Sequence, residues 1–288
     1  MYRFFVRPVL KLLSPRKAGK FALNALEFIC KVPILRLAVT SSFSHPSLKR
    51  TFFGLDFKNP VGVASGVDTS ARYFDEFSRM GASFVEIGPI SLSNEKDGHT
   101  PVRAIIDNIR ANAAGNSAVI AANICKSAGT PQSKVADEID RIYTLLYDFI
   151  DMAIIDLKGV RTENIAEIID RVTTIRRFND DHRPILIKLA QEMSNDEIDA
   201  AIHLILSYGL DGIVISGRSH NTDTLHYVID RSRNLLPVIV SGGIGSVAIA
   251  QEMLENGASM ISVGSFLRNG PHFIRRILRA LVPKPNKK

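Results

Sequence analysis

Eight short apolar runs, most of them followed by a stretch of helical periodicity, constrain this chain more than any other feature. Continuous apolar runs indicate strands that are buried on both faces, as in a parallel sheet covered by helices. The runs are Val61–Ser65, Ser83–Gly88, Val119–Ile124, Met152–Leu157, Pro184–Ala190, Asp211–Ser216, Pro237–Gly242 and Met260–Gly264. Eight such strand and helix units predict an α/β fold of the (β/α)8 (TIM) barrel type, in which functional residues lie where the strands end.

The length of the chain leaves room for an extension before the barrel. A barrel of this type takes about 250 residues, and the chain has 288. We therefore expect an N-terminal helical extension in residues 1–40 and the barrel in residues 41–288. The chain has two cysteines, Cys30 and Cys125, which is typical of a reducing compartment. No apolar stretch is long enough to span a bilayer, so we expect a protein of the cytoplasm.

The net charge of +7 is concentrated at the two ends of the chain. Residues 1–36 hold eight basic residues against one acid, and the last fifteen residues hold six basic residues and no acid. The segment between them therefore has six more acids than bases. An acidic barrel body without tryptophan, and without bases interleaved with aromatic residues, gives no indication of nucleic-acid binding.

The basic N-terminal segment has the pattern of two amphipathic helices. In residues 2–13, basic residues are spaced four apart and apolar residues fill much of the remaining surface. Ser14 and Pro15 then have the pattern of an N-cap and a first-turn proline, which starts a second helix that runs to about Val32. Such a pair of helices suits an anionic membrane surface, where apolar burial and basic residues both contribute. The alternative is an extension that packs on the barrel.

Glycines follow the seventh and eighth predicted strands. Gly242 and Gly243 end the seventh strand, and Gly264 with Ser265 ends the eighth. The loops after these two strands frequently bind phosphate in (β/α)8 barrels, because glycine lets backbone amides approach the oxygen atoms. Two ordinary turns that need glycine are the alternative. Because both pairs occur at the correct strands, we expect a phosphate site.

Three ionisable residues interrupt the apolar strands, namely Glu86, Asp156 and Lys188. A charge inside a barrel is costly unless it is paired or bound to a ligand. Lys188 therefore needs an electron-rich partner, either a ligand or one of the two carboxylates in an internal salt bridge. A lysine that faces a redox ring stabilises negative charge as electrons arrive, so Lys188 together with a phosphate site suggests a phosphorylated redox cofactor.

Other strand ends carry weaker signals. Residues 63–68 include small side chains that would let a flat ring lie against the backbone, and Asn123 and Ser216 lie at the ends of the third and sixth strands. A terminal asparagine or serine is also common as a helix cap or in a turn. The histidines show no pairing with acids or cysteines at ligand spacing, so no metal site is expected.

Together these segments resemble the dihydroorotate dehydrogenases, specifically the membrane-associated, quinone-reducing class with FMN. The shared pieces, besides the two N-terminal helices, are Gly54-Leu-Asp-Phe-Lys-Asn-Pro-Val-Gly62, Ala64-Ser-Gly-Val-Asp68, Val85-Glu-Ile-Gly88, Asn123-Ile-Cys-Lys126, Ile187-Lys-Leu-Ala190, Asp211-Gly-Ile213, Ser241-Gly-Gly-Ile244, Gly264-Ser265 and Asn269-Gly-Pro271. The resemblance spans most of the chain, and its order is preserved.

The resemblance implies a set of FMN contacts. Carried over by position, these are Ala64, Ser65, Gly66, Asn123, Lys188 and Ser216 around the flavin, with Gly242, Gly243, Gly264 and Ser265 on its phosphate. It also implies dihydroorotate as substrate in pyrimidine biosynthesis, a quinone as electron acceptor, and peripheral association with the cytoplasmic face of an anionic membrane.

The departures from the family pattern lie on the substrate side. The family's fourth strand leads into Asn-x-Ser-(Ser or Cys)-Pro-Asn, which supplies substrate amides and the catalytic base, whereas this chain has Asp156-Leu-Lys-Gly-Val-Arg161. Gly159 occupies the position of the base and cannot accept a proton, so the catalytic residue is not identified by the motif. Asp156 or Lys158 are the available substitutes. A family lysine and a family threonine are replaced by Thr69 and Pro89.

Two hypotheses follow. The first is an FMN-dependent oxidoreductase that passes electrons to a quinone and acts on dihydroorotate or on a different donor. The second is a catalytically inactive paralogue that keeps the barrel as a flavin-binding or membrane-associated interaction scaffold. Loss of a general base, which typically contributes about 10²–10⁴-fold to rate, is what separates the two.

Overall fold

Eight parallel strands form a closed barrel in the computed structural model, which describes residues 15–32, 40, 43–92, 100–112, 118–190, 192–216, 222–265 and 269–283. In chain order they are β3 (Val61–Asp68), β4 (Phe84–Ile90), β5 (Val119–Cys125), β6 (Met152–Asp156), β7 (Ile185–Leu189), β8 (Gly212–Ser216), β9 (Val238–Ser241) and β10 (Met260–Val263). Each strand pairs with the next along the chain, and β10 closes the ring on β3. The predicted (β/α)8 barrel is confirmed, and all eight predicted runs form its strands.

The first barrel strand is longer than its apolar run predicts. It continues to Asp68, past the expected end at Ser65. The pairing of β3 with β4 has an irregularity between Val63 and Asp68, after which Asp68 pairs with Ile87. Asp68 is buried and accepts hydrogen bonds from the backbone amides of Ser70, Arg72 and Tyr73, so this end of β3 is fixed to the turn that follows it.

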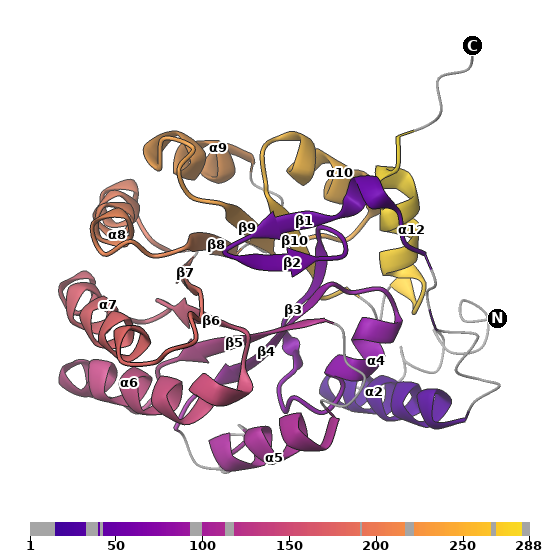
Figure 1. Cartoon of the computed structure of the whole chain (residues 1–288), viewed down its shortest axis with the longest axis horizontal. Coiled ribbons are helices and arrows are strands. Elements are labelled where there is room, and N and C mark those ends of the chain that lie inside the picture. Colours follow the sequence, from indigo (N-terminus) through magenta and orange to yellow (C-terminus); the bar gives the residue numbers. More distant parts are fainter. Residues whose placement is uncertain are drawn as a thin grey trace.

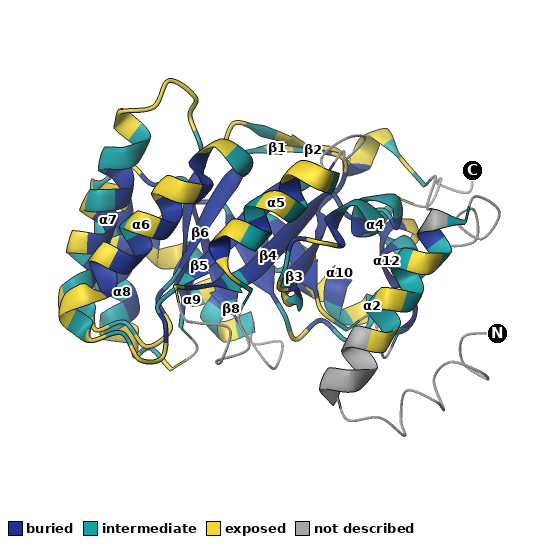
Figure 2. Ribbon diagram, turned by 90° about the horizontal axis from the view of Figure 1, so that it is seen from below, coloured by how far each residue is buried: buried dark blue, intermediate teal, exposed yellow. Residues whose placement is uncertain are grey.

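Helices cover the outside of the barrel, as Figures 1 and 2 show, with buried faces inward and exposed faces outward. They are α4 (Phe74–Arg79), α5 (Val102–Asn112), α6 (Val135–Leu146), α7 (Thr162–Arg177), α8 (Asn195–Ser207), α9 (Thr222–Arg231), α10 (Val247–Glu255) and α12 (Phe273–Leu281), with short 3₁₀ turns at η2 (Pro46–Leu48), η4 (Gln132–Lys134) and η5 (Tyr147–Phe149). On α6, for example, Val135, Ile139 and Ile142 are fully buried at helical spacing.

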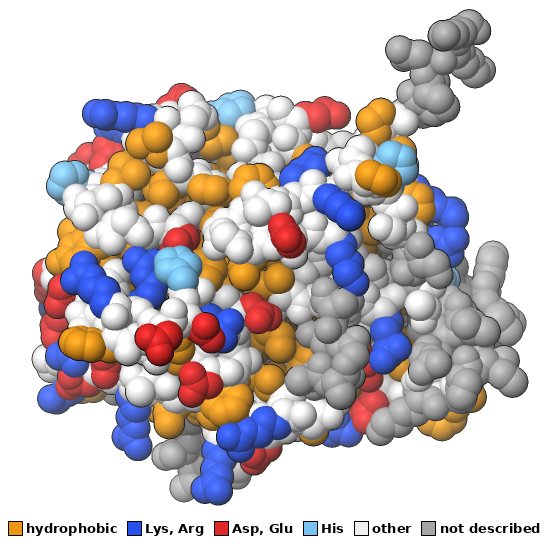
Figure 3. Space-filling view, viewed as in Figure 1, with side chains coloured by type: hydrophobic (Ala, Val, Ile, Leu, Met, Phe, Trp, Pro, Cys, Tyr) orange, Lys and Arg blue, Asp and Glu red, His pale blue; other side chains and the backbone are white. Residues whose placement is uncertain are grey.

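One end of the barrel is closed by a hairpin that the sequence analysis did not predict. Strands β1 (Arg50–Phe52) and β2 (Leu55–Phe57) pair antiparallel and lie across the barrel in Figure 1. Phe57 meets Phe84 of β4 edge to face, with 6.0 Å between the ring centroids. Figure 3 shows the same face of the molecule, where acidic and basic side chains are interspersed. The hairpin therefore lies at the amino ends of the strands, opposite their carboxyl ends.

The second N-terminal helix is present as predicted, as α2 (Pro15–Lys31), and it packs on the barrel. Its Glu27 pairs with Arg72 at 3.0 Å, and Tyr73 donates a hydrogen bond to Asn24 at 2.9 Å. Figure 2 shows α2 beside α4. Phe21 and Phe28 on α2 remain 50% and 63% exposed.

The structure leaves two predictions about the N-terminal segment as predictions. The first predicted helix, residues 2–13, lies outside them, and the boundary between an extension and a barrel domain at residue 40 stays a prediction. Within the described helices, none is both long enough and apolar enough to cross a membrane.

Candidate active site

The inner surface of the barrel changes from apolar to polar towards the carboxyl ends of the strands. Phe84, Ala121, Leu186, Ile239 and Met260 belong to one buried apolar cluster inside the barrel. Side chains two residues further along a strand point to the same face, so the next inward layer holds polar residues. This layer consists of Glu86, Asn123, Lys188, Ser241 and Ser262, all of them buried.

Glu86 is the centre of this layer, and its side chain is 0% exposed. Its carboxylate accepts hydrogen bonds from Lys188 Nζ at 3.1 Å and Ser241 Oγ at 2.9 Å. It also accepts a short hydrogen bond from Ser262 and one from the backbone amide of Ser65 at 3.3 Å. A buried carboxylate needs such compensation. The five residues come from five different strands, so Glu86 joins β3, β4, β7, β9 and β10.

Asn123 extends this network to the neighbouring strands. Its amide nitrogen donates to Ser65 Oγ at 2.9 Å and lies 3.5 Å from Asp156 Oδ2. Asn123 is 1% exposed, and its carbonyl oxygen Oδ1 has no hydrogen-bond partner among the described residues. Buried acceptors are normally satisfied, so this oxygen is the atom of the site that most clearly calls for a ligand donor.

Lys188 forms the internal salt bridge that the sequence left as an alternative, and its partner is Glu86 rather than Asp156. Asp156 is nevertheless its cross-strand neighbour in the register of β6 and β7. Among the described residues, Glu86 is the one hydrogen-bond acceptor of the Lys188 ammonium group. An ammonium group has three donors, so two remain for other partners. A contact between Lys188 and a cofactor stays a prediction.

The two predicted phosphate loops are joined to each other. Ser265 Oγ donates to the carbonyl of Ile244 at 2.8 Å, and Asn269 donates to the carbonyl of Gly245 at 3.0 Å. Gly242 and Gly243 have φ values of 81° and 71°, which favour glycine. The loops after β9 and β10 therefore lie together at the rim, and their binding of a phosphate stays a prediction.

The remaining predicted residues lie on the same rim. A Cβ atom built on Gly264 would lie 3.7 Å from the Cβ of Ala64, so the loop after β10 approaches β3. A Cβ atom on Gly66 would meet nothing within 4 Å, which indicates open space in front of it. Ser216 ends β8 as the cross-strand partner of Ser241. The structure thus brings the ten predicted cofactor residues to one end of the barrel, although no contact with a cofactor is tested.

Residues 156–161, where the resemblance to the family places the base motif, follow from the end of β6. Gly159 is exposed and has a φ of 71°, a backbone conformation that L side chains rarely adopt. The side-chain carbons of Lys126 lie 3.9 Å from where its Cβ would be. Asp156, two residues along β6 from the inward-facing Ile154, points to the interior, and its Oδ1 accepts the backbone amide of Lys158 at 3.0 Å. The Lys158 side chain itself is exposed.

Cys125 lies beside Asp156 on the neighbouring strand. Burial, with a further contribution from the Asp156 carboxylate, raises the pKa of its thiol to about 12. A thiol with this pKa stays protonated near neutral pH. The Cys125 thiol is therefore a poor proton acceptor near neutral pH.

A second buried carboxylate, Glu138 of α6, fastens two loops at this end of the barrel. It accepts the backbone amides of Leu92 and Ser127 at 3.0 and 3.1 Å, and the hydroxyl of Ser127. Burial alone would raise the pKa of Glu138, but these hydrogen bonds, together with one from Thr130, outweigh it and hold the pKa below its usual value. Glu138 thus ties the end of β4 to the loop after β5, which carries Lys126.

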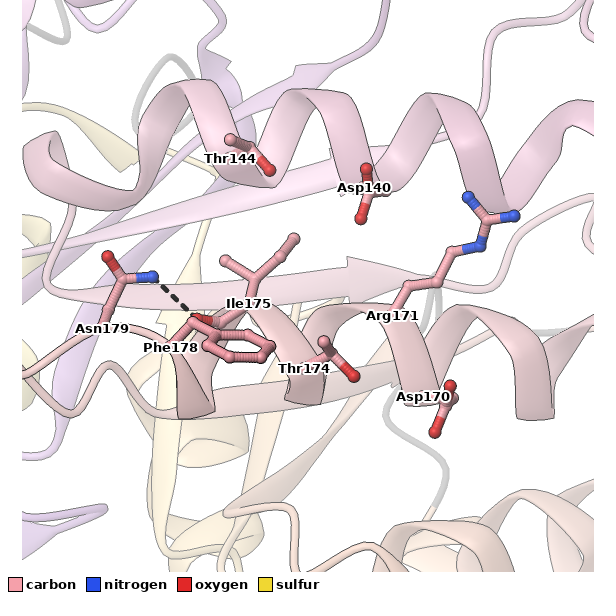
Figure 4. A pocket seen from close by; sticks show the side chains of 8 residues that line it. All are labelled: Asp140, Thr144, Asp170, Arg171, Thr174, Ile175, Phe178 and Asn179. Carbon is pink, nitrogen blue, oxygen red and sulfur yellow. Dashed lines mark hydrogen bonds between the residues drawn. The ribbon is translucent and has the colours of Figure 1, made fainter.

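A groove on the outer surface is not part of this site. It has a volume of about 400 Å³ and lies between α6 and α7, with Asp140 and Thr144 on one side and Arg171, Ile175 and Phe178 on the other (Figure 4). Phe178 follows the last turn of α7 and precedes β7, so this part of the groove is towards the amino ends of the strands.

Among the described residues, no group of three or more histidine, cysteine or acidic side chains is arranged to hold a metal ion.

Sequence reasoning missed three members of the site. Ser241 ends one apolar strand and Ser262 lies within another, each two residues after an inward-facing apolar side chain. This spacing of two residues was the available signal, because it puts both serines on the inner face. Glu138 occupies the apolar face of its helix, between Val135 and Ile142. A charged residue at such a position indicates a buried partner.

The fold is a (β/α)8 barrel whose polar layer lies towards the carboxyl ends of the strands, the end at which barrels of this type bind their ligands. The sequence matches the family model described as dihydroorotate dehydrogenase over residues 47–136 and 156–284. The chain therefore belongs to the dihydroorotate dehydrogenase family.

Individual relatives agree with this assignment. The chain is 25% identical to dihydroorotate dehydrogenase (quinone) of Christiangramia forsetii, with 99% of each protein covered. It is 24% identical to the enzyme of the same name from Actinobacillus pleuropneumoniae serotype 5b, covering 95% of this chain and 97% of that protein. Among solved structures, DHODH from Eimeria tenella in complex with ferulenol has a TM-score of 0.81 at 19% identity, covering 95% and 93% of the two chains. The structural similarity supports the fold.

Proposed function

We propose that this protein is an FMN-dependent oxidoreductase that oxidises dihydroorotate, or a related donor if the altered substrate side excludes it, and passes the electrons to a quinone. The two bacterial relatives named above carry the name dihydroorotate dehydrogenase (quinone), and this similarity supports a reaction in pyrimidine biosynthesis. When bound, FMN would accept a hydride from the donor and pass its two electrons on to the quinone. The observation that carries the proposal is the unsatisfied Asn123 Oδ1 beside the Glu86–Lys188 pair.

The residues at the rim fit FMN. Asn123 Oδ1 is a buried acceptor without a donor, and Lys188 has two unused donors among the described residues. These two groups complement the N–H and C=O groups on the edge of an isoalloxazine ring. In front of Gly66 there is open space, and Gly242, Gly243, Gly264 and Ser265 form the joined loops for the phosphate.

Asp156 is the group best positioned to take the substrate proton in place of the base missing at Gly159. It faces the interior beside Lys188, and its Oδ1 is held by the amide of Lys158. Oxidation of the donor releases one hydride to the flavin and one proton, and the carboxylate would accept that proton. A lysine at this task needs a pKa lowered by burial, and the Lys158 side chain is exposed.

The test is flavin binding followed by anaerobic reduction. The purified protein should bind FMN with flavin absorbance, and dihydroorotate should bleach it in the absence of oxygen. A protein that stays oxidised with dihydroorotate, yet is reduced by another donor and reoxidised by quinone, has a changed substrate. A protein that binds no FMN would contradict the proposal and favour the scaffold function, for which the exposed Gly159 is the supporting observation.

We further propose peripheral association with the cytoplasmic face of an anionic membrane through the N-terminal helices. Phe21 and Phe28 are seven residues apart, hence on one face of α2, and both are at least half exposed although α2 packs on the barrel through its other side. The variant Phe28→Asp should bind anionic vesicles more weakly than wild type in a sedimentation assay. Phe178→Asp, at a phenylalanine that is 86% exposed elsewhere, is the matched control and should bind like wild type.

A further inference from the structure

We propose that Glu86 is a positioning residue that sets the charge of the cofactor site, by cancelling the positive charge of Lys188 while leaving its hydrogen-bond donors in place. This inference rests on the proposed binding of FMN. Glu86 does not appear among the residues that the sequence assigned to the cofactor. It is nevertheless the residue to which Lys188, Ser65, Ser241 and Ser262 are all bound.

Hydrogen bonds hold both oxygens of the Glu86 carboxylate. Lys188 is 5% exposed and its ammonium lies 3.1 Å from Glu86 Oε2, while Oε1 of the same carboxylate accepts from Ser241 and Ser262. The two serines also bond to each other at 2.8 Å. Both carboxylate oxygens are therefore held, and the carboxylate has little freedom to turn away from the lysine. The position of the lysine amine follows from that of Glu86.

Glu86 balances the positive charge of Lys188. In the inward-facing polar layer of the described residues, Lys188 is the one cation and Glu86 is its direct counter-ion. A pair at this distance in a buried site acts on a nearby group mainly as a dipole, whereas a lone ammonium acts as a full positive charge. Positive charge beside a flavin stabilises the electron-rich reduced form. Glu86 would therefore lower the reduction potential of the bound flavin relative to a site with an unpaired lysine.

Charge cancellation by Glu86 and structural support by Glu86 have different effects on the reduction potential of the flavin. A residue that only holds the barrel together would change stability when replaced, but not the reduction potential of the flavin. A residue that cancels charge must change the potential when its charge is removed, and must leave it unchanged when the charge is kept. Glu86→Gln removes the charge at nearly constant size, and Glu86→Asp keeps it. Ser241→Ala removes one hydrogen bond to Glu86 without changing any charge.

The experiment measures the midpoint potential of bound FMN in wild type and the three variants by dye-equilibrated anaerobic titration. Wild type and the three variants are titrated at the same pH. We expect Glu86→Gln to shift the potential upward, and Glu86→Asp and Ser241→Ala to remain close to wild type. An unchanged or lower potential in Glu86→Gln, or an equal shift in Glu86→Asp, would overturn the inference.

A second comparison applies if Glu86→Gln does not fold. Lys188→Met leaves Glu86 without its counter-ion, and Lys188→Met/Glu86→Gln removes both charges. The double variant should have the higher flavin potential of the two, and equal potentials would overturn the inference. Wild-type protein that binds no FMN would contradict the proposed function itself, and this inference with it. Wild-type protein that binds FMN without oxidising dihydroorotate still permits the measurement, so the two failures are distinguishable.

Discussion

Lys188 and Glu86 form a buried ion pair, 3.1 Å apart, although 102 positions separate them in the chain. Glu86 also links Ser241, Ser262 and Ser65, and Ser65 accepts a hydrogen bond from Asn123. The floor of the site is therefore a connected polar layer across most strands of the barrel. Because its members are already bonded to one another, the layer is formed by the protein alone.

Breaking this pair on one side should be costly. Lys188→Met leaves the Glu86 carboxylate buried without its cation, and removal of one partner of a buried pair typically costs about 3–5 kcal/mol. The free energy of unfolding, measured by urea denaturation, should fall by an amount of this order. The double variant Lys188→Met/Glu86→Gln should recover much of the loss. Equal stability of wild type and Lys188→Met would show that the pair is not formed in solution.

The barrel was predictable from sequence because each strand lies in a predominantly apolar run, and β6, β7 and β8 match their predicted runs within one residue at either end. The hairpin of β1 and β2 could not be predicted from sequence, because each of its strands has three residues. So short a run gives no periodic signal. Phe53 and Gly54 in its turn have positive φ values. Because a bulky residue such as phenylalanine rarely adopts a positive φ, Phe53 gave no sequence signal for a turn.

The site was predictable in part. Lys188, Asn123 and the glycine loops could be singled out because they are polar or glycine residues at strand ends. The carboxylate that pairs with Lys188 could not be predicted, because β4 carries Glu86 and β6 carries Asp156. The closed barrel decides between the two. Glu86 reaches the lysine across the interior, whereas Asp156, on the adjacent strand, is held instead by the amide of Lys158.

Asp156 should be required for oxidation of the donor. Asp156→Asn keeps the size of the side chain but removes the proton acceptor, so the rate of flavin reduction should fall by about 10²–10⁴-fold. Lys158→Met is the matched control, since the Lys158 side chain is exposed and its backbone amide still holds Asp156. Stopped-flow reduction of the flavin checks this. A larger loss in Lys158→Met than in Asp156→Asn would assign the proton to the lysine.

Restoring a side chain at Gly159 should not restore a base. Its φ of 71° disfavours any L residue, at a cost of roughly 1–2 kcal/mol. Gly159→Ser and Gly159→Ala should therefore lose similar stability in urea denaturation, because the strain is common to both. Neither should reduce the flavin faster than wild type. A marked gain of activity in Gly159→Ser alone would show that the loop can adopt a different backbone conformation.

Glu138 should make the stability of the fold depend on acid. Its pKa is lowered in the folded state, so its contribution is fully present above the unfolded-state pKa of about 4.5 and is lost as the pH falls through the lower, folded-state pKa. Glu138→Gln lacks this component and should be less stable than wild type at neutral pH. The difference in melting temperature between the two proteins should shrink on acidification below about pH 4.5. A constant difference across this range would contradict the assignment.

A structure of the protein determined in the presence of FMN tests most directly whether the carboxyl-terminal end of the barrel holds this cofactor. We predict a ring within hydrogen-bond reach of Asn123 Oδ1 and Lys188 Nζ, with the phosphate on the loops that contain Gly243 and Gly264. A rim filled by the protein's own side chains, with no ring bound there at saturating FMN, would contradict it.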